Sequence, residues 1–246
     1  NHRYDTIDYH SVEPDIGTEE ELKTLIAEAH ALGLRVMIDA VFNHCGAKCA
    51  LWQDVLEKGP QSDYYHWFCV NRWPIDAQTH ATKRGDYFSF AFVDNMPKFD
   101  TSEPDVMEYL TGIAKHWVCE WKVDGIRFDV GNEISHAFLK HLRLELKKCN
   151  PKLFLLGEIW HDAFPWLLGD EYDSTMNYPF LACVNNFWAD KTQSGTDFMH
   201  GINQCYSMYY EQVNRVLFNL LDSHDTDRLM ERCHGNADMF LAQLTV

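Results

Sequence analysis

The chain contains the stretch Gly125-Ile126-Arg127-Phe128-Asp129, a short and mostly apolar run that ends abruptly in an acid. A strand that is buried in a parallel sheet is nearly continuously apolar. α/β enzymes place their reactive groups just beyond the carboxyl ends of such strands. Similar runs elsewhere in the chain are Val36-Met37-Ile38-Asp39, Leu153-Phe154-Leu155-Leu156-Gly157-Glu158 and Leu217-Phe218-Asn219-Leu220-Leu221-Asp222-Ser223-His224-Asp225. Together they indicate carboxylates that converge on one pocket.

Helical patterns precede several of these runs, and this alternation predicts parallel β/α units. The first helix begins at a capping box, Thr18-Glu19-Glu20-Glu21, and ends at Gly33. A second opens at Ser102, and a third runs from about 135 to 148. Their apolar faces consist of Leu22, Leu25, Ile26, Ala29 and Leu32 in the first, Val106, Leu110, Ile113, Ala114, Trp117 and Trp121 in the second, and Phe138, Leu139, Leu142 and Leu146 in the third.

The spacing of the acids refines the architecture. About one β/α unit separates Asp129 from Glu158, and about two units separate Glu158 from Asp225. The interval from Asp39 to Asp129 is longer than one unit by about 60 residues. This surplus falls in residues 45–100, which are rich in Trp, Tyr, Phe, Pro and Asp and have weak periodicity. We therefore expect a small subdomain inserted in a β/α loop, with residues 1–44 and 101–246 forming the rest.

Strands are predicted at about 35–41, 125–129, 153–157, 172–177 and 216–221, and the last segment, 237–246, looks helical. A closed (β/α)8 TIM barrel needs eight strands. The expected fold class is therefore an α/β TIM barrel that is incomplete in this chain, with strands before Asn1 and after Val246. An open doubly wound sheet needs fewer strands and is the second choice.

The composition limits the partners. Lys and Arg number 21 against 37 for Asp and Glu, which gives a formal charge of −16 and argues against nucleic acid or an anionic membrane surface. No apolar stretch approaches the roughly 20 residues that a membrane helix needs. With 46% hydrophobic residues the chain can bury a large core. Because it begins with neither Met nor a signal peptide, we expect it to be a piece of a longer protein.

The eight cysteines do not form the disulfide framework of a small secreted domain. His44-Cys45 with Cys49 could suggest a metal site, but no second Cys/His pair with zinc spacing accompanies it. We therefore predict reduced thiols, no metal site and a cytoplasmic location.

Two of the acids have surroundings that predict different protonation states. Side chains alternate along a strand, so Arg127 and Asp129 point the same way, and a guanidinium favours an ionised carboxylate. Glu158 lies among Leu155, Leu156, Ile159 and Trp160, and apolar surroundings favour a protonated acid. One ionised and one protonated acid form the pair that cleaves a glycosidic bond. The alternative is that these acids form buried ion pairs or helix caps.

Other polar and aromatic residues lie near the same strand ends. His44 and His224 each lie within a few residues of a candidate acid, where a neutral imidazole could bind sugar hydroxyls, although lone histidines are more often structural. Sugar rings stack on aromatic faces, and most of the aromatic residues here will still be ordinary packing. Those that we expect to crowd the rim are Tyr4, Trp52, Tyr64, Tyr65, Trp67, Trp73 and Trp160.

Four ordered motifs resemble those of the α-amylase family, glycoside hydrolase family 13. They are Asp39-Ala40-Val41-Phe42-Asn43-His44, Gly125 to Glu133, Gly157-Glu158-Ile159-Trp160 and Ser223-His224-Asp225-Thr226. The insertion at 45–100 lies where that family carries its domain B, after the third barrel strand. Asn132-Glu133, Met96-Pro97-Lys98 and Met176-Asn177-Tyr178-Pro179-Phe180 resemble the branch of cyclomaltodextrinases, neopullulanases and maltogenic amylases.

The resemblance implies a retaining mechanism, with Asp129 as nucleophile, Glu158 as general acid and base, and Asp225 as transition-state stabiliser. It implies that Arg127, His44 and His224 hold the sugar, that Tyr4 stacks beneath it and that Asp39 positions Arg127. Asn132 and Glu133 would line the acceptor side, where hydrolysis is tuned against transglycosylation. The implied substrates are α-1,4-linked and in some cases α-1,6-linked glucans, namely cyclodextrins, pullulan or maltooligosaccharides.

The resemblance implies no required cofactor. Some members bind calcium near their N-terminus, so the resemblance leaves room for a calcium site in the parent protein. The branch includes homodimers that close the active site with an N-terminal domain absent here. Departures from the branch are Phe128 and Gly131, which are mild, and Asp222, which stands where Gly is usual. Asp222 could repel Asp225 or simply face away. The alternative function is a catalytically inactive family member that binds carbohydrate or acts as a scaffold.

Overall fold

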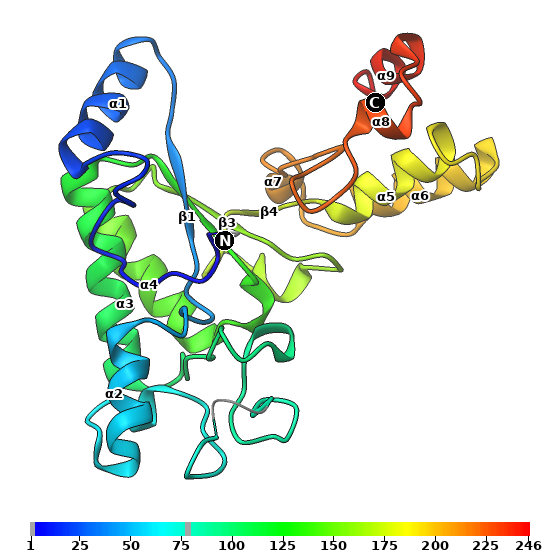
Figure 1. Ribbon diagram of the computed structural model, residues 1–246. Coiled ribbons are helices and arrows are strands. Elements are labelled where there is room, and N and C mark those ends of the chain that lie inside the picture. The colour runs from blue at the N-terminus through cyan, green and yellow to red at the C-terminus, as the bar shows by residue number, and fades with distance from the viewer. Residues whose placement is uncertain (1–2, 77–79) are drawn as a thin grey trace. The chain divides into compact units, whose positions relative to one another are not determined.

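The computed structural model describes residues 3–76 and 80–246, which divide into two compact units, 1–155 and 156–246 (Figure 1). The first unit contains α1 (Glu19–Ala31), β1 (Met37–Ala40), α2 (Ala50–Lys58), η1 (Gly59–Gln61), η2 (Tyr65–Trp67), η3 (Phe90–Phe92), α3 (Pro104–His116), η4 (Trp117–Trp121), β2 (Gly125–Phe128), η5 (Gly131–Glu133) and α4 (His136–Cys149). Strand β3 (Phe154–Gly157) crosses the boundary. The second unit contains η6 (Phe164–Trp166), β4 (Ser174–Thr175), α5 (Tyr178–Trp188), α6 (Gly195–Ser207), α7 (Glu211–Asn214), α8 (Leu229–Arg232) and α9 (Ala237–Gln243).

The four strands form one sheet in the order β1-β2-β3-β4. Strands β1 and β2 are parallel, with Asp39 opposite Arg127 and Ala40 opposite Phe128. Strands β3 and β4 are also parallel, with Gly157 opposite Thr175. Parallel neighbours need a crossover connection, and the helices α3 and α4 supply it before β2 and β3. This confirms the predicted β/α units.

Gly157, the residue before Glu158, has a packing reason to lack a side chain. A Cβ atom there would lie 2.6 Å from the ring of Tyr172, well inside van der Waals contact. The ring of Tyr172 therefore packs directly against the backbone at the end of β3. Any larger residue would displace this ring and with it the backbone that carries Glu158.

The predicted helices are present, and one predicted apolar face is wrong. The Thr18 side chain accepts from the N–H of Glu21 and completes the capping box of α1. Leu25 and Leu32 are nevertheless 60% and 78% exposed, because α1 packs chiefly on η4 and buries Ile26 there. The predicted faces of α3, η4 and α4 are buried as expected. Helix α3 begins at Pro104, two residues after the predicted opening at Ser102, and the Ser102 hydroxyl donates to Asp100 instead.

The fifth predicted strand, 216–221, does not form. Only one parallel bridge, Met176 to Phe218, remains of it. The N–H of Phe218 donates to the Ser174 hydroxyl at 3.0 Å instead of to a backbone carbonyl. The N–H of Asn219 turns back to the carbonyl of Leu217. The Ser174 side chain and a tight turn thus take up the backbone N–H groups that a longer pairing of strands would require.

The described residues of the segment 45–100 form an irregular structure with one α-helix, α2, and short 3-10 turns. Isolated antiparallel bridges, such as Phe68 with Phe99 and Val70 with Tyr87, connect its loops. Trp52 is only 1% exposed and packs on Phe68 and Tyr87, so it belongs to the core of the segment and not to a substrate rim. Part of this segment, residues 77–79, lies outside the described residues.

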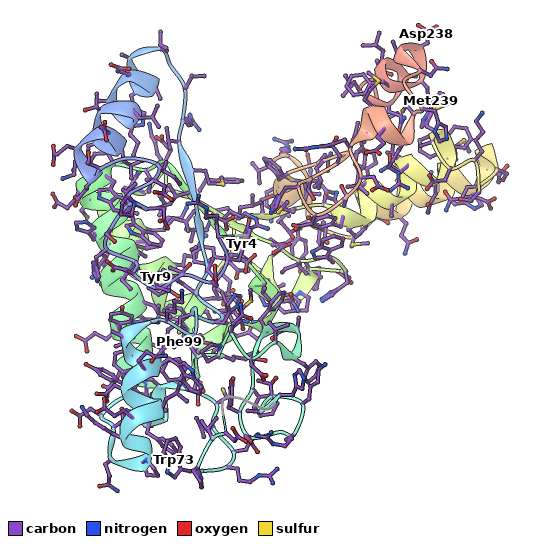
Figure 2. All side chains as sticks on the ribbon, viewed as in Figure 1. Tyr4, Tyr9, Trp73, Phe99, Asp238 and Met239 are labelled. Carbon is purple, nitrogen blue, oxygen red and sulfur yellow. The ribbon has the colours of Figure 1, made fainter. Side chains whose placement is uncertain are left out.

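An aromatic core supports the carboxyl ends of β1 and β2. The ring of Phe42 contacts those of Trp117, Phe128 and Phe138, which come from η4, β2 and α4. The Tyr9 hydroxyl lies within hydrogen-bond distance of the carbonyls of Val41 and His44 (Figure 2). The backbone after β1 is therefore fixed by packing and by hydrogen bonds.

The second unit has its own core, in which Phe180, Cys183 and Val184 of α5 pack with Cys205 of α6. Within residues 3–76 and 80–246, none of the helices combines the length and the apolar character that a bilayer span needs.

Candidate active site

Asp39 and Arg127 form a close ion pair at the carboxyl ends of β1 and β2. Their opposite positions in the parallel register put both side chains on the same face. Arg127 Nη1 lies 2.7 Å from Asp39 Oδ1 and 2.6 Å from Oδ2. The same nitrogen lies 3.5 Å from Asp129 Oδ1, which confirms that Arg127 and Asp129 point the same way. One guanidinium thus connects the carboxylates of two neighbouring strands.

Tyr4 joins this group from the N-terminal segment (Figure 2). Its hydroxyl donates to Asp39 Oδ2 at 2.9 Å and accepts from Arg127 Nη1 at 3.4 Å. The guanidinium carbon of Arg127 lies 5.9 Å from the centre of the Tyr4 ring, at cation–π distance. Burial and the negative charge of Asp39 raise the pKa of Tyr4, so its hydroxyl stays a hydrogen-bond donor.

Asp129 is buried and is followed by a strained residue. Asp129 is 8% exposed, and its N–H donates to the carbonyl of Ala40. Val130 has φ 49° and ψ 44°, a left-handed conformation that is rare for a β-branched residue. Such strain is stored preferentially at functional sites. It turns the chain directly into η5, which carries Asn132 and Glu133.

Glu133 is not an isolated carboxylate. Lys98 Nζ donates to Glu133 Oε2 at 2.5 Å, and the Glu133 side chain is 42% exposed. Lys98 belongs to the end of the irregular segment and forms an isolated antiparallel bridge with His44. The predicted acceptor-side residue is thus paired with a cation from that segment.

His44 is fully buried. It is 0% exposed, and its ring stacks on Phe90 with the centroids 5.1 Å apart. Its Nε2 lies 3.0 Å from the Tyr4 carbonyl, and its Nδ1 lies 3.2 Å from Asn43 Nδ2. Because a carbonyl can only accept, Nε2 carries the proton and Nδ1 accepts. His44 therefore holds the backbone of Tyr4 in this structure, and its predicted contact with sugar stays a prediction.

In the second unit, Glu158 is buried and its carboxylate is held by a neighbouring indole. Glu158 is 7% exposed, and Trp160 Nε1 donates to Glu158 Oε1 at 3.0 Å. The Trp160 ring stacks on Tyr178 with the centroids 3.8 Å apart and the planes at 9°. Trp160 itself is 49% exposed, so one face of this stack borders solvent.

Tyr178, one ring of this stack, is connected to Asp225 through the Ser223 hydroxyl. The Tyr178 hydroxyl donates to Ser223 Oγ at 3.3 Å, and the N–H of Asp225 donates to the same oxygen at 3.1 Å. Tyr178 therefore links the loop after β3 to the loop that carries Asp225. Asp225 remains exposed, and its Oδ2 lies 3.3 Å from His224 Nε2. The predicted sugar ligand His224 thus lies beside the predicted stabiliser Asp225.

Asp222, the unusual acid of the fourth motif, is occupied elsewhere. Its Oδ2 accepts from the N–H of Leu229 at 2.8 Å, and its Oδ1 lies 3.2 Å from Arg228 Nη1. Both oxygens therefore stabilise the start of α8. This favours the second of the two sequence interpretations, in which Asp222 is directed away from Asp225.

Sequence reasoning missed the roles of Tyr178 and Ser223. Tyr178 appears in the motif Met176-Asn177-Tyr178-Pro179-Phe180, and Ser223 in the fourth motif, but neither had a predicted role. A signal was present: an aromatic residue at the start of a helix and a hydroxyl immediately before a candidate acid. The contact between them joins positions too far apart in the chain for spacing alone to reveal.

One cluster of potential metal ligands occurs in the part of the chain that the structure describes. His66, Glu103 and Asp105 place their ligand atoms within 4.8 Å of one another at the start of α3. Calcium takes six to eight oxygen ligands, so a group with one imidazole, the half-buried Glu103 and the exposed Asp105 does not fit it. His66 Nε2 already lies 3.3 Å from Asp105 Oδ2, and acids are favourable at a helix N-terminus without a metal.

Comparison with known proteins decides the family. Residues 1–245 match the family described as "Alpha amylase, catalytic domain". The chain belongs to the alpha-amylase family. Its parallel β/α arrangement is therefore that of a TIM-barrel glycosidase, of which the described strands form a part.

Individual relatives show which members of the alpha-amylase family this chain is similar to. It is 44% identical to a cyclomaltodextrinase from Geobacillus thermopakistaniensis over 100% of this chain and 42% of that protein. It is also 44% identical to an intracellular maltogenic amylase from Bacillus subtilis, over 96% of this chain and 39% of that protein. A solved complex of cyclic alpha-maltosyl-(1→6)-maltose hydrolase from Arthrobacter globiformis with maltose has a TM-score of 0.92 and 33% identity, covering 98% of this chain and 54% of that one. The chain thus spans about two fifths of the length of the curated relatives.

Proposed function

We propose that the protein is a retaining α-glucan hydrolase that cleaves glucosidic bonds of cyclodextrins, pullulan or maltooligosaccharides. The observation that carries this proposal is the burial of two acids in a chain that belongs to the alpha-amylase family: Asp129 of the first unit and Glu158 of the second are 8% and 7% exposed. Burying a carboxylate is costly unless it is paired, and both are held, by Arg127 and by Trp160. A relative with maltose bound supports an oligosaccharide substrate.

In the proposed mechanism, Asp129 attacks the anomeric carbon and forms a covalent glycosyl intermediate. Glu158 donates a proton to the departing oxygen and then removes a proton from the incoming water or sugar hydroxyl. Arg127 keeps Asp129 ionised, and Asp39 and Tyr4 hold Arg127 in place. Asp225 binds sugar hydroxyls and stabilises the positive charge of the transition state, with His224 beside it.

The remaining assignments belong to the same proposal. His44 supports the cleavage subsite through Tyr4, and Asn132 and Glu133 line the acceptor side, where transglycosylation competes with hydrolysis. Residues 45–100 form domain B, and 1–44 and 101–246 form the barrel portion. The irregular structure of residues 45–100, with α2 and isolated bridges, supports this division.

The carboxylates supply nucleophile, acid and base, so we propose that the reaction requires no cofactor. A calcium site in the rest of the protein and a homodimeric state stay predictions, which dialysis against EDTA and sedimentation velocity would decide. We also propose a cytoplasmic location, because all eight cysteines are free thiols and a relative is named an intracellular enzyme.

The test is hydrolysis of cyclodextrin and pullulan by the full-length protein, with Asp129→Asn and Glu158→Gln. We expect each variant to lose about 10²- to 10⁴-fold in kcat. Asp238→Asn, the same change at an exposed acid of α9, is the matched control and should leave kcat unchanged. Retention predicts that the first sugar released has the α configuration, which NMR reads directly, and that the two carboxyl groups lie about 5–5.5 Å apart in a crystal structure.

Each outcome separates the alternatives. A wild-type protein that binds maltooligosaccharides but never cleaves them would establish the inactive carbohydrate-binding form. A β-configured first product, or wild-type turnover in either variant, would refute the retaining mechanism with these residues.

A further inference from the structure

Three side chains from α5 and its N-cap hold the segment of chain that leads to Asp225. They contact every second residue of this segment: Asn177 contacts Asn219 at 2.8 Å, Asn185 contacts the carbonyl of Leu221 at 3.1 Å, and Tyr178 contacts Ser223 at 3.3 Å. The strand predicted at 216–221 is reduced here to a single bridge at Phe218. Helix side chains thus supply contacts that a longer pairing of strands would otherwise give.

Two of the three side chains have a second role. Asn177 also caps α5, because its Oδ1 accepts from the N–H of Phe180. Tyr178 also stacks on Trp160, whose indole donates to Glu158. A change at Asn177 would therefore disturb the helix, and a change at Tyr178 would disturb the surroundings of Glu158. Asn185 is the member of the set that tests the contact with the Asp225 segment separately.

Asn185 is deeply buried and its amide has a fixed orientation. It is 1% exposed and follows Tyr178 by seven residues, so two turns of helix place both side chains on the same face of α5. Because a carbonyl can only accept, the amide nitrogen of Asn185 faces Leu221. The amide oxygen has no hydrogen-bond partner among the described residues. Burying an amide is costly unless it is hydrogen-bonded, so the bond to Leu221 is the contact that offsets this cost.

This bond fixes the chain just before the turn that carries Asp225. The Leu221 side chain packs on the core of the second unit while its carbonyl accepts from Asn185. Two residues later, Ser223 Oγ accepts from the N–H of Asp225 at 3.1 Å, and the Ser223 N–H donates to Thr226 Oγ1 at 2.9 Å. Such bonds between hydroxyls and nearby backbone groups close a tight turn. A displacement at Leu221 is therefore passed on to the backbone of Asp225.

We propose that Asn185 is a positioning residue for Asp225. By holding the Leu221 carbonyl, it fixes the turn so that the Asp225 carboxylate lies where it stabilises the transition state of glucoside cleavage, a role that rests on the proposed function. Asn185 is buried and acts through the backbone of the segment. Losing its bond should therefore lower activity only while residue 225 carries a carboxylate.

The test is a double-mutant cycle in the full-length protein, with maltotriose as substrate. Asn185→Ala removes the donated bond, and we expect about a fivefold lower kcat. In an Asp225→Asn background the same change should lower kcat by less than about twofold, because the group that is positioned is already lost. Asn185→Leu removes the bond without leaving a cavity and should behave in the same way. Asn186→Ala, at the next and half-buried residue of α5, is the matched control and should keep the wild-type kcat.

Hydrogen exchange gives a second readout that does not depend on cleavage. In Asn185→Ala, the amides of residues 219–226 should exchange about fivefold faster, as mass spectrometry of the peptides would measure. The peptides of α6 should exchange at the wild-type rate. A general loss of stability would instead accelerate exchange in both regions.

The proposal is wrong if Asn185→Ala keeps the wild-type kcat, if it lowers kcat equally with and without the Asp225 carboxylate, or if exchange of residues 219–226 is unchanged. Wild-type kcat in Asp225→Asn alone would refute the proposed function of Asp225. The exchange experiment would then still decide whether Asn185 holds this segment in place.

Discussion

Replacing Trp160 by Phe should weaken Glu158, the proposed general acid, without destroying the site. The change removes the indole N–H that donates to Glu158 at 3.0 Å, and it keeps an aromatic ring to stack on Tyr178. A hydrogen bond to a charged group contributes about 1.5–3 kcal/mol. Because Trp160 is half exposed, the lower end applies, and about 1.5 kcal/mol corresponds to about a tenfold loss in kcat.

The choice of substrate makes this prediction specific. A maltooligosaccharide needs a proton on its leaving oxygen, whereas fluoride leaves from a maltosyl fluoride without general-acid help. We therefore expect about a tenfold lower kcat for maltotriose and less than about a twofold change for α-maltosyl fluoride. A purely structural effect would lower both equally.

Trp188 provides the matched control. Within the described residues its indole nitrogen has no hydrogen-bond partner, so Trp188→Phe replaces the indole by a phenyl ring without removing a hydrogen bond. We expect this variant to keep the wild-type kcat on both substrates. Equal losses on both substrates for Trp160→Phe, or the same loss for Trp188→Phe, would refute the idea that the indole acts through Glu158.

Two further changes test the supporting structure. Asp39→Asn removes the negative charge that pairs with the largely buried Arg127, so the free energy of unfolding should fall by about 1–2 kcal/mol in urea titrations. An unchanged urea midpoint would contradict a stabilising role of this ion pair. Burial acts to raise the pKa of Asp124, but hydrogen bonds from the Val36 N–H and the His30 ring outweigh it, so the pKa of Asp124 is lowered in the folded protein. Asp124 therefore stabilises the fold above its unfolded pKa of about 3.9. This contribution is lost as the pH falls through the lower folded pKa. Asp124→Asn should therefore be less stable at pH 6 and lose less stability between pH 5 and pH 2, and parallel pH profiles of Tm for both proteins would argue against it.

The sequence predicts contacts that follow from strand geometry. Arg127 and Asp129 are two residues apart on one strand, so alternation alone places them together, and their 3.5 Å contact follows. Asp39 joins them because parallel strands meet in register. These relations depend on local periodicity, which a single sequence contains.

Other features depend on tertiary choices that local patterns do not encode. The missing fifth strand results from the Ser174 hydroxyl, which takes a backbone N–H that a ladder would use. The exposure of Leu25 depends on which face of α1 meets η4, and an amphipathic pattern does not specify the neighbour. The bond from Tyr178 to Ser223 joins two loops whose approach only the folded chain determines.

The pairing of Lys98 with Glu133 limits how this chain can be recombined with its relatives. Lys98 belongs to the proposed domain B, and Glu133 to the loop after β2, so one ion pair crosses the boundary along which a chimera would be cut. Grafting residues 45–100 from a donor without a cation at this position would leave the Glu133 carboxylate without this lysine beside the proposed acceptor site. Product profiles of such chimeras would therefore change even when both parents keep every proposed catalytic acid, and exchanging the two positions together should restore them.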